Sequence, residues 1–168
     1  MDAVEVFNSL PAARLEEDLL ACLAAPAWGS AVIAGRPYAR RDDILAAADA
    51  AARALSLDDV LTGLSAHPRI GERAGGDTRE AAWSRREQSA AAQSADEVTK
   101  AALIEANRAY EGKFGHVFLI FASGRTQEDI LAAARERLTN DPAAEREIVA
   151  DELRKIGRLR LERVLDAL

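Results

Sequence analysis

The chain has little of what disulfide-bonded, secreted or membrane-spanning proteins need. Its single cysteine, Cys22, excludes an internal disulfide and a cysteine-based zinc site of the usual spacing. No run of about 18 consecutive apolar residues is present, and the first ten residues, MDAVEVFNSL, lack the apolar centre of a secretory leader. We therefore expect no membrane partner, a reducing environment and a cytoplasmic location.

Signals for nucleic acid, nucleotide and metal sites are also missing. The 22 Lys and Arg and 28 Asp and Glu residues are interspersed and give a net charge of −6, so no basic stripe exists for nucleic acid. The segment GERAGG lacks the lysine and the preceding strand of a phosphate-binding loop, and no G-x-S-x-G serine elbow occurs. The two histidines lie far apart, which predicts no metal site. Acid, base and anion-binding groups remain, without a cofactor signature.

The remaining composition favours a helical protein. Hydrophobic residues make up 49% of the 168 residues, and they recur three and four positions apart. These features predict an all-α, single-domain bundle of about eight helices over residues 1–168. Helices are expected near 4, over 12–25, 44–55, 57–67, 79–92, 95–113 and 126–138, and from 142 onward. The apolar run FGHVFLIFASG (114–124) fits a buried strand or a helix, and class consistency favours the helix.

A histidine stands at the predicted end of one helix, in LSAHPRIGERAGG. His67 follows Val60 and Leu64 at helical spacing, and Pro68 disfavours helical geometry at the residue before it. An imidazole with a pKa near ~6.5 can both accept and donate a proton at neutral pH. The alternative is a capping or hydrogen-bonded core histidine, which the local pattern alone favours.

The segment WSRREQSAAA gathers three polar side chains on one face of a predicted helix. Ser84, Glu87 and Gln88 lie at positions i, i+3 and i+4. They could line a polar pocket in which Glu87 orients, or shares a proton with, a histidine. A solvated helix face is the alternative, and the spacing alone favours it.

The last predicted helix carries an arginine on its apolar side. Arg160 falls at the centre of this face, whereas Arg158 points well away from it. An arginine on such a face usually pairs with a carboxylate, either the protein's own or a ligand's, and both alternatives stay open. The residues of the face are Val149, Leu153, Ile156, Val164 and Leu168.

Three other residues receive structural interpretations. Asn107 shares a helix stripe with Leu103 and Tyr110, where an amide is out of place unless it ties down backbone or a ligand, and we expect a structural tie rather than a catalytic role. His116 lies in an apolar run and is expected to pack there. Cys22, in LLACLA, is expected to be a small buried residue.

Taken in order along the chain, these motifs resemble a known family, the 2-oxo-4-hydroxy-4-carboxy-5-ureidoimidazoline (OHCU) decarboxylases of uric acid breakdown. The order and spacing of the segments make the resemblance specific, and it spans nearly the whole chain. The segments are FNSL, PAWGSAVIAGRPY, HPRIGER, SRREQSA, NRAYEGKFGHVFLIFASGR and ELRKIGRLRLERV.

The resemblance implies an all-helical domain, usually a homodimer, that needs no metal or organic cofactor. The implied small-molecule substrate, a ureidoimidazoline, loses CO2 to give (S)-allantoin. His67 would be catalytic, with Glu87 working beside it. The implied substrate contacts are Pro68, Ser84, Gln88, Phe118, Leu119, Ile120 and an arginine of RLR, for which the helical wheel favours Arg160 over Arg158.

Two other functions remain as alternatives. One is a helical module whose polar face binds a partner protein, and the other is a decarboxylase of a related ureido acid. A substitution of His67 that preserves the fold separates the first from an enzyme, and competition by allantoin and allantoate analogues separates the second.

Overall fold

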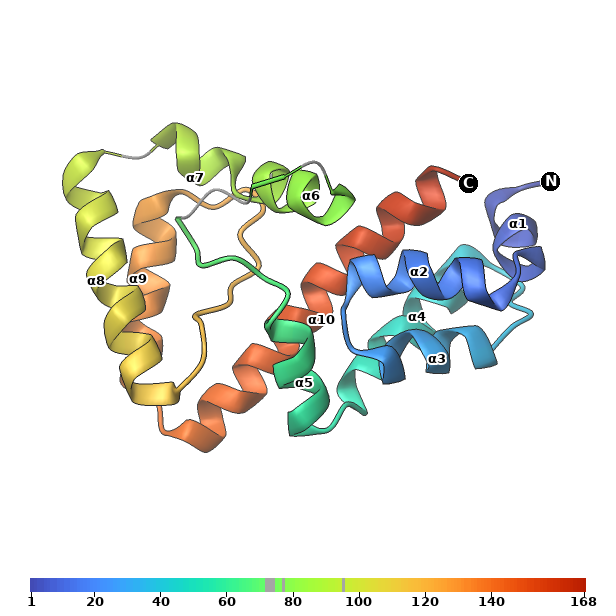
Figure 1. Cartoon of the computed structure of the whole chain (residues 1–168), viewed down its shortest axis with the longest axis horizontal. Helices are drawn as coiled ribbons and strands as arrows, with labels where there is room; N and C mark the ends of the chain where they lie inside the picture. Colours follow the sequence, from blue (N-terminus) through green and yellow to red (C-terminus); the bar gives the residue numbers. More distant parts are fainter. Residues whose placement is uncertain (72–74, 77, 95) are drawn as a thin grey trace. The chain divides into compact units, whose positions relative to one another are not determined.

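The computed structural model describes residues 1–71, 75–76, 78–94 and 96–168, and within them it is all-helical with no strand (Figure 1). The all-α prediction is confirmed, but these residues form ten helices and not about eight. The helices are α1 (Ala3–Ser9), α2 (Ala12–Cys22), α3 (Pro26–Ala34), α4 (Arg41–Arg53), α5 (Leu57–Leu64), α6 (Arg79–Glu87), α7 (Ser89–Ser94), α8 (Glu97–Phe114), α9 (Gln127–Arg137) and α10 (Pro142–Asp166). None of them is both long and apolar enough to cross a bilayer.

Helix α3 was missed because its opening segment, APAWGS, resembles a helix break. Pro26 occupies the first turn of α3, where its missing N–H costs no hydrogen bond. Trp28 is buried, and its indole nitrogen donates to the carbonyl of Ala48 at 2.9 Å. The proline therefore starts a helix here.

The helix predicted over 79–92 is divided into two. Thr78 caps α6 by accepting a hydrogen bond from the backbone of Ala81, and α6 ends at Glu87. Gln88 leaves helical geometry with φ −94° and ψ 5°, and α7 follows from Ser89. The predicted start of the next helix at 95 lies outside the described residues, and Asp96 is the cap of α8.

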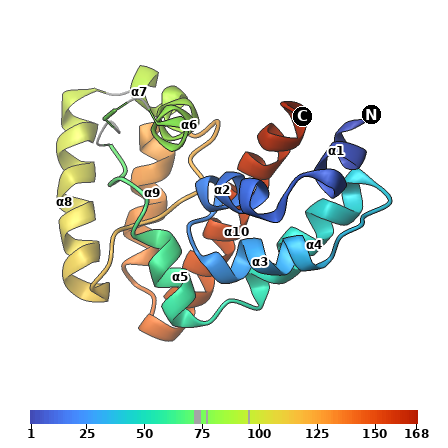
Figure 2. The same cartoon turned by 45° about the vertical axis from the view of Figure 1, so that its right-hand side comes forward.

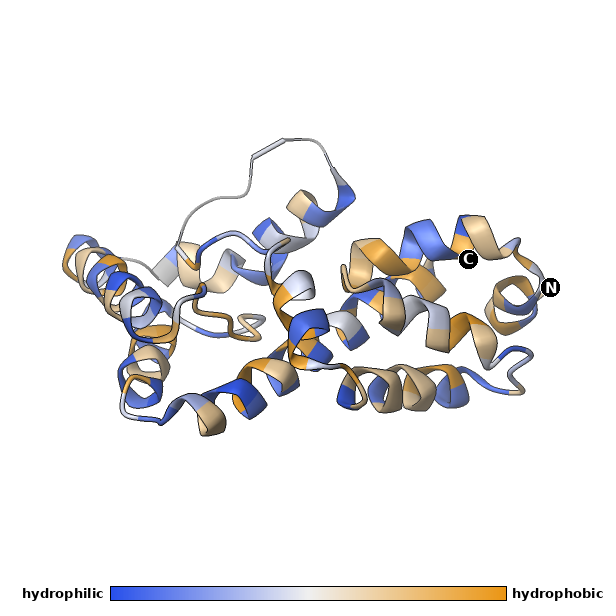
Figure 3. Ribbon diagram, turned by 60° about the horizontal axis from the view of Figure 1, so that its bottom comes forward, coloured by the Kyte–Doolittle hydropathy of each residue, from blue (hydrophilic) through white to orange (hydrophobic). Residues whose placement is uncertain are grey.

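The chain divides into two compact units, unit 1 (residues 1–63 and 150–168) and unit 2 (residues 64–149). In unit 1, α3 packs against both α2 and α4. Along the helices, hydrophobic and hydrophilic residues alternate in the manner of amphipathic helices (Figure 3). The largest fully buried side chains of unit 1 are Trp28, Phe7, Leu15, Leu19, Leu23, Ile44 and Leu153.

In unit 2, α8 and α9 lie side by side in both views (Figures 1 and 2). Helix α8 is capped at its C-terminus by Gly115, whose φ of +79° is the left-handed conformation that glycine adopts without strain. Buried residues of both helices form one core with residues of the connection between them. Its members include Leu103, Ala106, Tyr110, Phe118, Ile120, Ile130 and Ala134.

The helix expected within 114–124 is wrong, because residues 115–126 form an irregular connection. Phe118, Leu119 and Ile120 are nevertheless buried. Arginine side chains bind carbonyls that a helix would have used internally. Arg137 donates to the carbonyl of Leu119 at 2.6 Å, and Arg125 donates to the carbonyl of Phe121 at 3.0 Å.

A buried ion pair anchors the arginine that holds this connection. Arg137 is 6% exposed and Glu145, in the first turn of α10, is fully buried. Arg137 Nε and Nη2 lie 2.7 and 2.6 Å from Glu145 Oε1. The Tyr110 hydroxyl donates to the same oxygen at 2.5 Å, and the guanidinium stands 4.6 Å from the centre of the Phe118 ring. The cation is thus paired, hydrogen-bonded and packed on an aromatic face.

We expect Arg137→Leu to lower the free energy of unfolding by about 3–5 kcal/mol, because it leaves the Glu145 carboxylate buried without its partner. Urea unfolding followed by circular dichroism measures the change. Arg69→Ala is the matched control, because the Arg69–Glu111 pair is more exposed and its loss should cost about 0–1 kcal/mol. Equal effects of the two substitutions would contradict the prediction.

Alkaline titration tests the environment of the chain's two tyrosines. Burial, together with the hydrogen bond to Glu145, raises the pKa of Tyr110, and burial raises the pKa of Tyr38 against the opposing charge of Arg36. Because both pKa values are higher in the folded state, stability present below about pH 10 should be lost as the pH rises above it. The fully buried Tyr110 should therefore ionise only together with loss of the helical signal, whereas the partly exposed Tyr38 should ionise above its usual range. Ionisation of both tyrosines near pH 10 in the folded protein would refute this.

Candidate active site

His67 lies just beyond the end of α5. That helix ends at Leu64, three residues before the predicted end, and the backbone N–H of His67 donates to the carbonyl of Leu64 at 3.0 Å. His67 and Pro68 are both partly exposed. The turn thus places the imidazole in a loop, with Pro68 directly after it.

The polar face of α6 is not a solvated surface. Ser84 is 7% exposed and Glu87 is 6% exposed, and Gln88 is partly buried at the end of the helix. Burial of a hydroxyl and a carboxylate one turn apart requires partners or a task for both groups. The interpretation of this face as solvent-exposed is therefore wrong.

Ser84 and Gln88 line a cavity of about 430 Å³ within unit 2, together with Ile70 and Gly71 of the loop that follows His67. Its described lining residues include Arg85, which donates to the carbonyl of Gly76 at 3.2 Å, and Lys100, which forms an ion pair with Glu97 at 3.4 Å. His67 and Glu87 are not in the cavity lining. The other lining residues are Ser89, Ala91, Ala92, Gln93, Leu103 and Gln127.

Hydrogen bonds join this loop to α6 and α8. The N–H of Gly71 donates to Gln88 Oε1 at 3.2 Å, and Asn107 Nδ2 donates to the carbonyl of Ile70 at 2.8 Å. The structural tie expected for Asn107 is confirmed. Its partner could not be known from sequence, because no local spacing relates residues 37 positions apart.

The two arginines of RLR differ in their surroundings within unit 1. Arg158 is partly exposed and forms ion pairs with Asp49 and Glu162. Arg160 is 4% exposed, and its Nη1 lies 3.5 Å from the carbonyl oxygen of Ala21. Of the apolar face expected around Arg160, Leu168 is exposed and follows the end of α10.

Phe118, Leu119 and Ile120 lie in unit 2, and their buried, irregular backbone is held through the carbonyl of Leu119 as described above. Cys22 is buried, with its thiol 3.3 Å from the carbonyl oxygen of Asp18. His116 packs edge-on against Tyr110, with ring centres 5.6 Å apart. The structural interpretations of Cys22 and His116 are confirmed. In the part of the chain that the structure describes, no three His, Cys, Asp or Glu side chains cluster in a way that could hold a metal.

Comparison with known proteins gives one consistent family. The family model described as OHCU decarboxylase matches residues 8–162. The chain belongs to the OHCU decarboxylase family. The match covers parts of both compact units, and it confirms the resemblance that the sequence motifs indicate.

Two curated relatives show the same relationship. The chain is 33% identical over 144 residues to a 2-oxo-4-hydroxy-4-carboxy-5-ureidoimidazoline decarboxylase of Amia calva, covering 83% of this chain and 81% of the relative. It is 32% identical over 151 residues to the uric acid degradation bifunctional protein TTL of Arabidopsis thaliana, covering 89% of this chain. The chain spans about half, 47%, of the length of that relative.

Two solved structures share the fold. A crystal structure of an OHCU decarboxylase in the presence of (S)-allantoin is 30% identical with a TM-score of 0.76, covering 90% of this chain and 98% of that one. A crystal structure of an (S)-allantoin synthase is 21% identical with a TM-score of 0.72, covering 95% of this chain and 53% of that one. The second likeness concerns the fold alone.

Gly71 provides a test of the loop geometry at the cavity. Its φ is +90°, and a Cβ built there would meet Leu103 Cδ2 at 3.4 Å. We expect Gly71→Ala to lower stability by about 1–2 kcal/mol, because L-residues are strained in this conformation. Gly112→Ala, an exposed helical position with open space around it, should instead raise stability by about 1 kcal/mol. Thermal unfolding measures both, and changes of the same sign would contradict the expected strain.

Proposed function

We propose that this chain catalyses the decarboxylation of 2-oxo-4-hydroxy-4-carboxy-5-ureidoimidazoline to (S)-allantoin in uric acid breakdown, without a metal or organic cofactor. Membership of the OHCU decarboxylase family carries this proposal. The cavity adds support, because its lining includes Ser84 and Gln88, two of the residues that carry the resemblance.

Bond cleavage makes two demands on the protein. The bond between the ring carbon and the carboxylate breaks, CO2 leaves, and the electron pair passes into the adjoining imidazoline system. Hydrogen-bond donors fixed toward that system lower the barrier by stabilising the developing negative charge. A proton delivered to one face then gives the S product.

We assign these tasks to the residues that carry the resemblance. His67 exchanges the proton, and Glu87 holds the tautomer and charge state of the imidazole. Ser84, Gln88, Arg160 and backbone groups of 118–120 orient the ureido and ring oxygens, and Pro68 shapes the pocket beside the histidine. The choice of Arg160 over Arg158 is supported by the ion pairs that Arg158 forms with two carboxylates of the protein itself, Asp49 and Glu162.

The oligomeric state, the location and the domain organisation belong to the same proposal. The resemblance supports a homodimer, the single cysteine supports a reducing, cytoplasmic location, and the family match over 8–162 supports a single domain. Light scattering after size-exclusion chromatography measures the mass of the assembly.

The chirality of the product tests the proposed activity, because the substrate also decays unaided to racemic allantoin. The wild-type protein should give (S)-allantoin from freshly generated substrate. His67→Asn should lose this selectivity while its circular dichroism stays helical. His116→Asn is the matched control, because His116 packs in the core connection and should keep the S selectivity.

Racemic allantoin at the background rate from the wild-type protein would overturn the proposal. S-selective turnover that persists in His67→Asn would overturn the role of His67. Competition assays with allantoin and allantoate analogues test the identity of the substrate. Inhibition of turnover by allantoin supports this substrate, whereas inhibition by allantoate analogues instead supports a related ureido acid.

A further inference from the structure

One peptide group beside the cavity is held at both of its polar ends. The carbonyl of Ile70 accepts a hydrogen bond from Asn107 Nδ2 at 2.8 Å, and the N–H of Gly71 donates to Gln88 Oε1 at 3.2 Å. These atoms belong to the same planar trans peptide unit, in which C=O and N–H point in opposite directions. Asn107 on α8 and Gln88 after α6 therefore hold this unit from opposite sides.

This arrangement fixes the orientation of the Gln88 amide. A backbone N–H can only donate, so the atom of Gln88 that faces Gly71 must be its oxygen. The amide nitrogen then lies on the other side of the planar group, and it forms no hydrogen bond to any residue within the described ranges. Because Gln88 lines the cavity, its N–H groups are available to an acceptor atom bound there.

The same reasoning fixes Asn107. The carbonyl of Ile70 can only accept, so Asn107 must present its NH2 group to it. Asn107 is 6% exposed and lies on the buried face of α8, together with Leu103. The side chain of Ile70 is buried in the core of unit 2, so the peptide unit is anchored by packing as well as by hydrogen bonds.

We infer that Asn107 is a positioning residue that acts through the Ile70–Gly71 peptide on Gln88. By holding this peptide, Asn107 maintains the hydrogen bond from the Gly71 N–H to Gln88 Oε1. This hydrogen bond orients the Gln88 NH2 group toward an oxygen of the substrate. Gln88 is then a donor to a carbonyl or carboxylate oxygen and not an acceptor for a substrate N–H. The inference rests on the proposed function.

Steady-state kinetics of (S)-allantoin formation test the inference. Asn107→Leu keeps the approximate volume of the side chain and removes the donor. It should lower kcat/KM by about 10- to 100-fold, because a misplaced binding group costs that order of rate. KM should rise, whereas partial unfolding would lower the apparent kcat in proportion and leave KM unchanged. Asn107→Ser, which cannot reach the carbonyl of Ile70, serves if the leucine variant does not fold.

A double-mutant cycle then identifies the route of action. In a Gln88→Leu background, Asn107→Leu should cause no further loss of kcat/KM, because both changes remove the same contact to substrate. Gln88→Glu should be as impaired as Gln88→Leu, since it keeps an oxygen for the Gly71 N–H and loses the donor. Additive losses in the cycle, or full activity of Gln88→Glu, would overturn the inference.

Asn8 provides a matched control in unit 1. Its side chain also forms hydrogen bonds with the backbone of a loop. It donates to the carbonyl of Tyr38 at 2.8 Å and accepts from the N–H of Tyr38 at 2.8 Å. Asn8→Leu should lower the melting temperature and leave KM unchanged. A KM increase equal to that of Asn107→Leu would overturn the inference.

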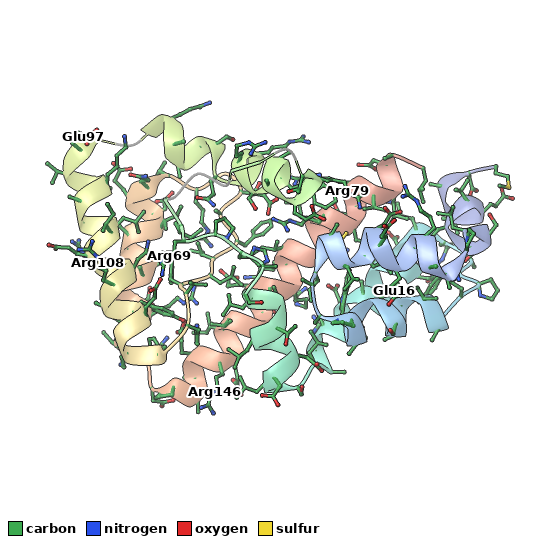
Figure 4. All side chains as sticks on the ribbon, viewed as in Figure 1. Glu16, Arg69, Arg79, Glu97, Arg108 and Arg146 are labelled. Atoms are coloured by element: carbon green, nitrogen blue, oxygen red, sulfur yellow. The ribbon has the colours of Figure 1, made fainter. Side chains whose placement is uncertain are left out.

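An exposed position on α8 supplies a second control. Arg108 projects outward from the helix next to Asn107 in sequence (Figure 4), and Arg108→Ala should change neither KM nor the melting temperature. A KM increase in this variant equal to that of Asn107→Leu would overturn the inference.

A wild-type protein that forms no (S)-allantoin would overturn the proposed function. An active wild-type protein whose variants show additive losses in the cycle would overturn only the role of Asn107.

Discussion

The Arg137–Glu145 ion pair is the interaction on which the architecture of unit 2 depends. A connection of irregular backbone lies in the core, where unpaired carbonyls are costly. The Arg137 guanidinium donates a hydrogen bond to one of these carbonyls, that of Leu119. The ion pair with Glu145 compensates the cost of burying that charged guanidinium. The core can thus contain Phe118–Ile120 without a helix or a strand.

Signals that act over a few residues could be predicted from the sequence. Asp141 caps α10 with Pro142 at its first position, and Thr126 caps α9, as their local patterns indicate. The wrong helix over 114–124 arises because tertiary contacts replace local hydrogen bonds there. The run after Gly115 is apolar enough for a helix, but side chains of Arg137 and Arg125 bind its carbonyls.

The sequence could predict which residue types belong to the candidate site, but not their burial or their hydrogen-bond partners. The spacing of Ser84 and Glu87 shows that they share a helix face, and only packing shows that the face is buried. The links from Asn107 to Ile70 and from Gln88 to Gly71 join residues 37 and 17 positions apart. No periodicity relates such residues, so no pattern in the sequence could reveal them.

The break at Gln88 separates the registers of α6 and α7. In an uninterrupted helix, one inserted residue rotates everything beyond it by about 100°. The non-helical backbone of Gln88 absorbs such a rotation, so changes in the length of α7 need not disturb Ser84 and Glu87. The part of the cavity lining that α7 supplies, which includes Ala91 and Ala92, is therefore separated in helical register from the polar face of α6.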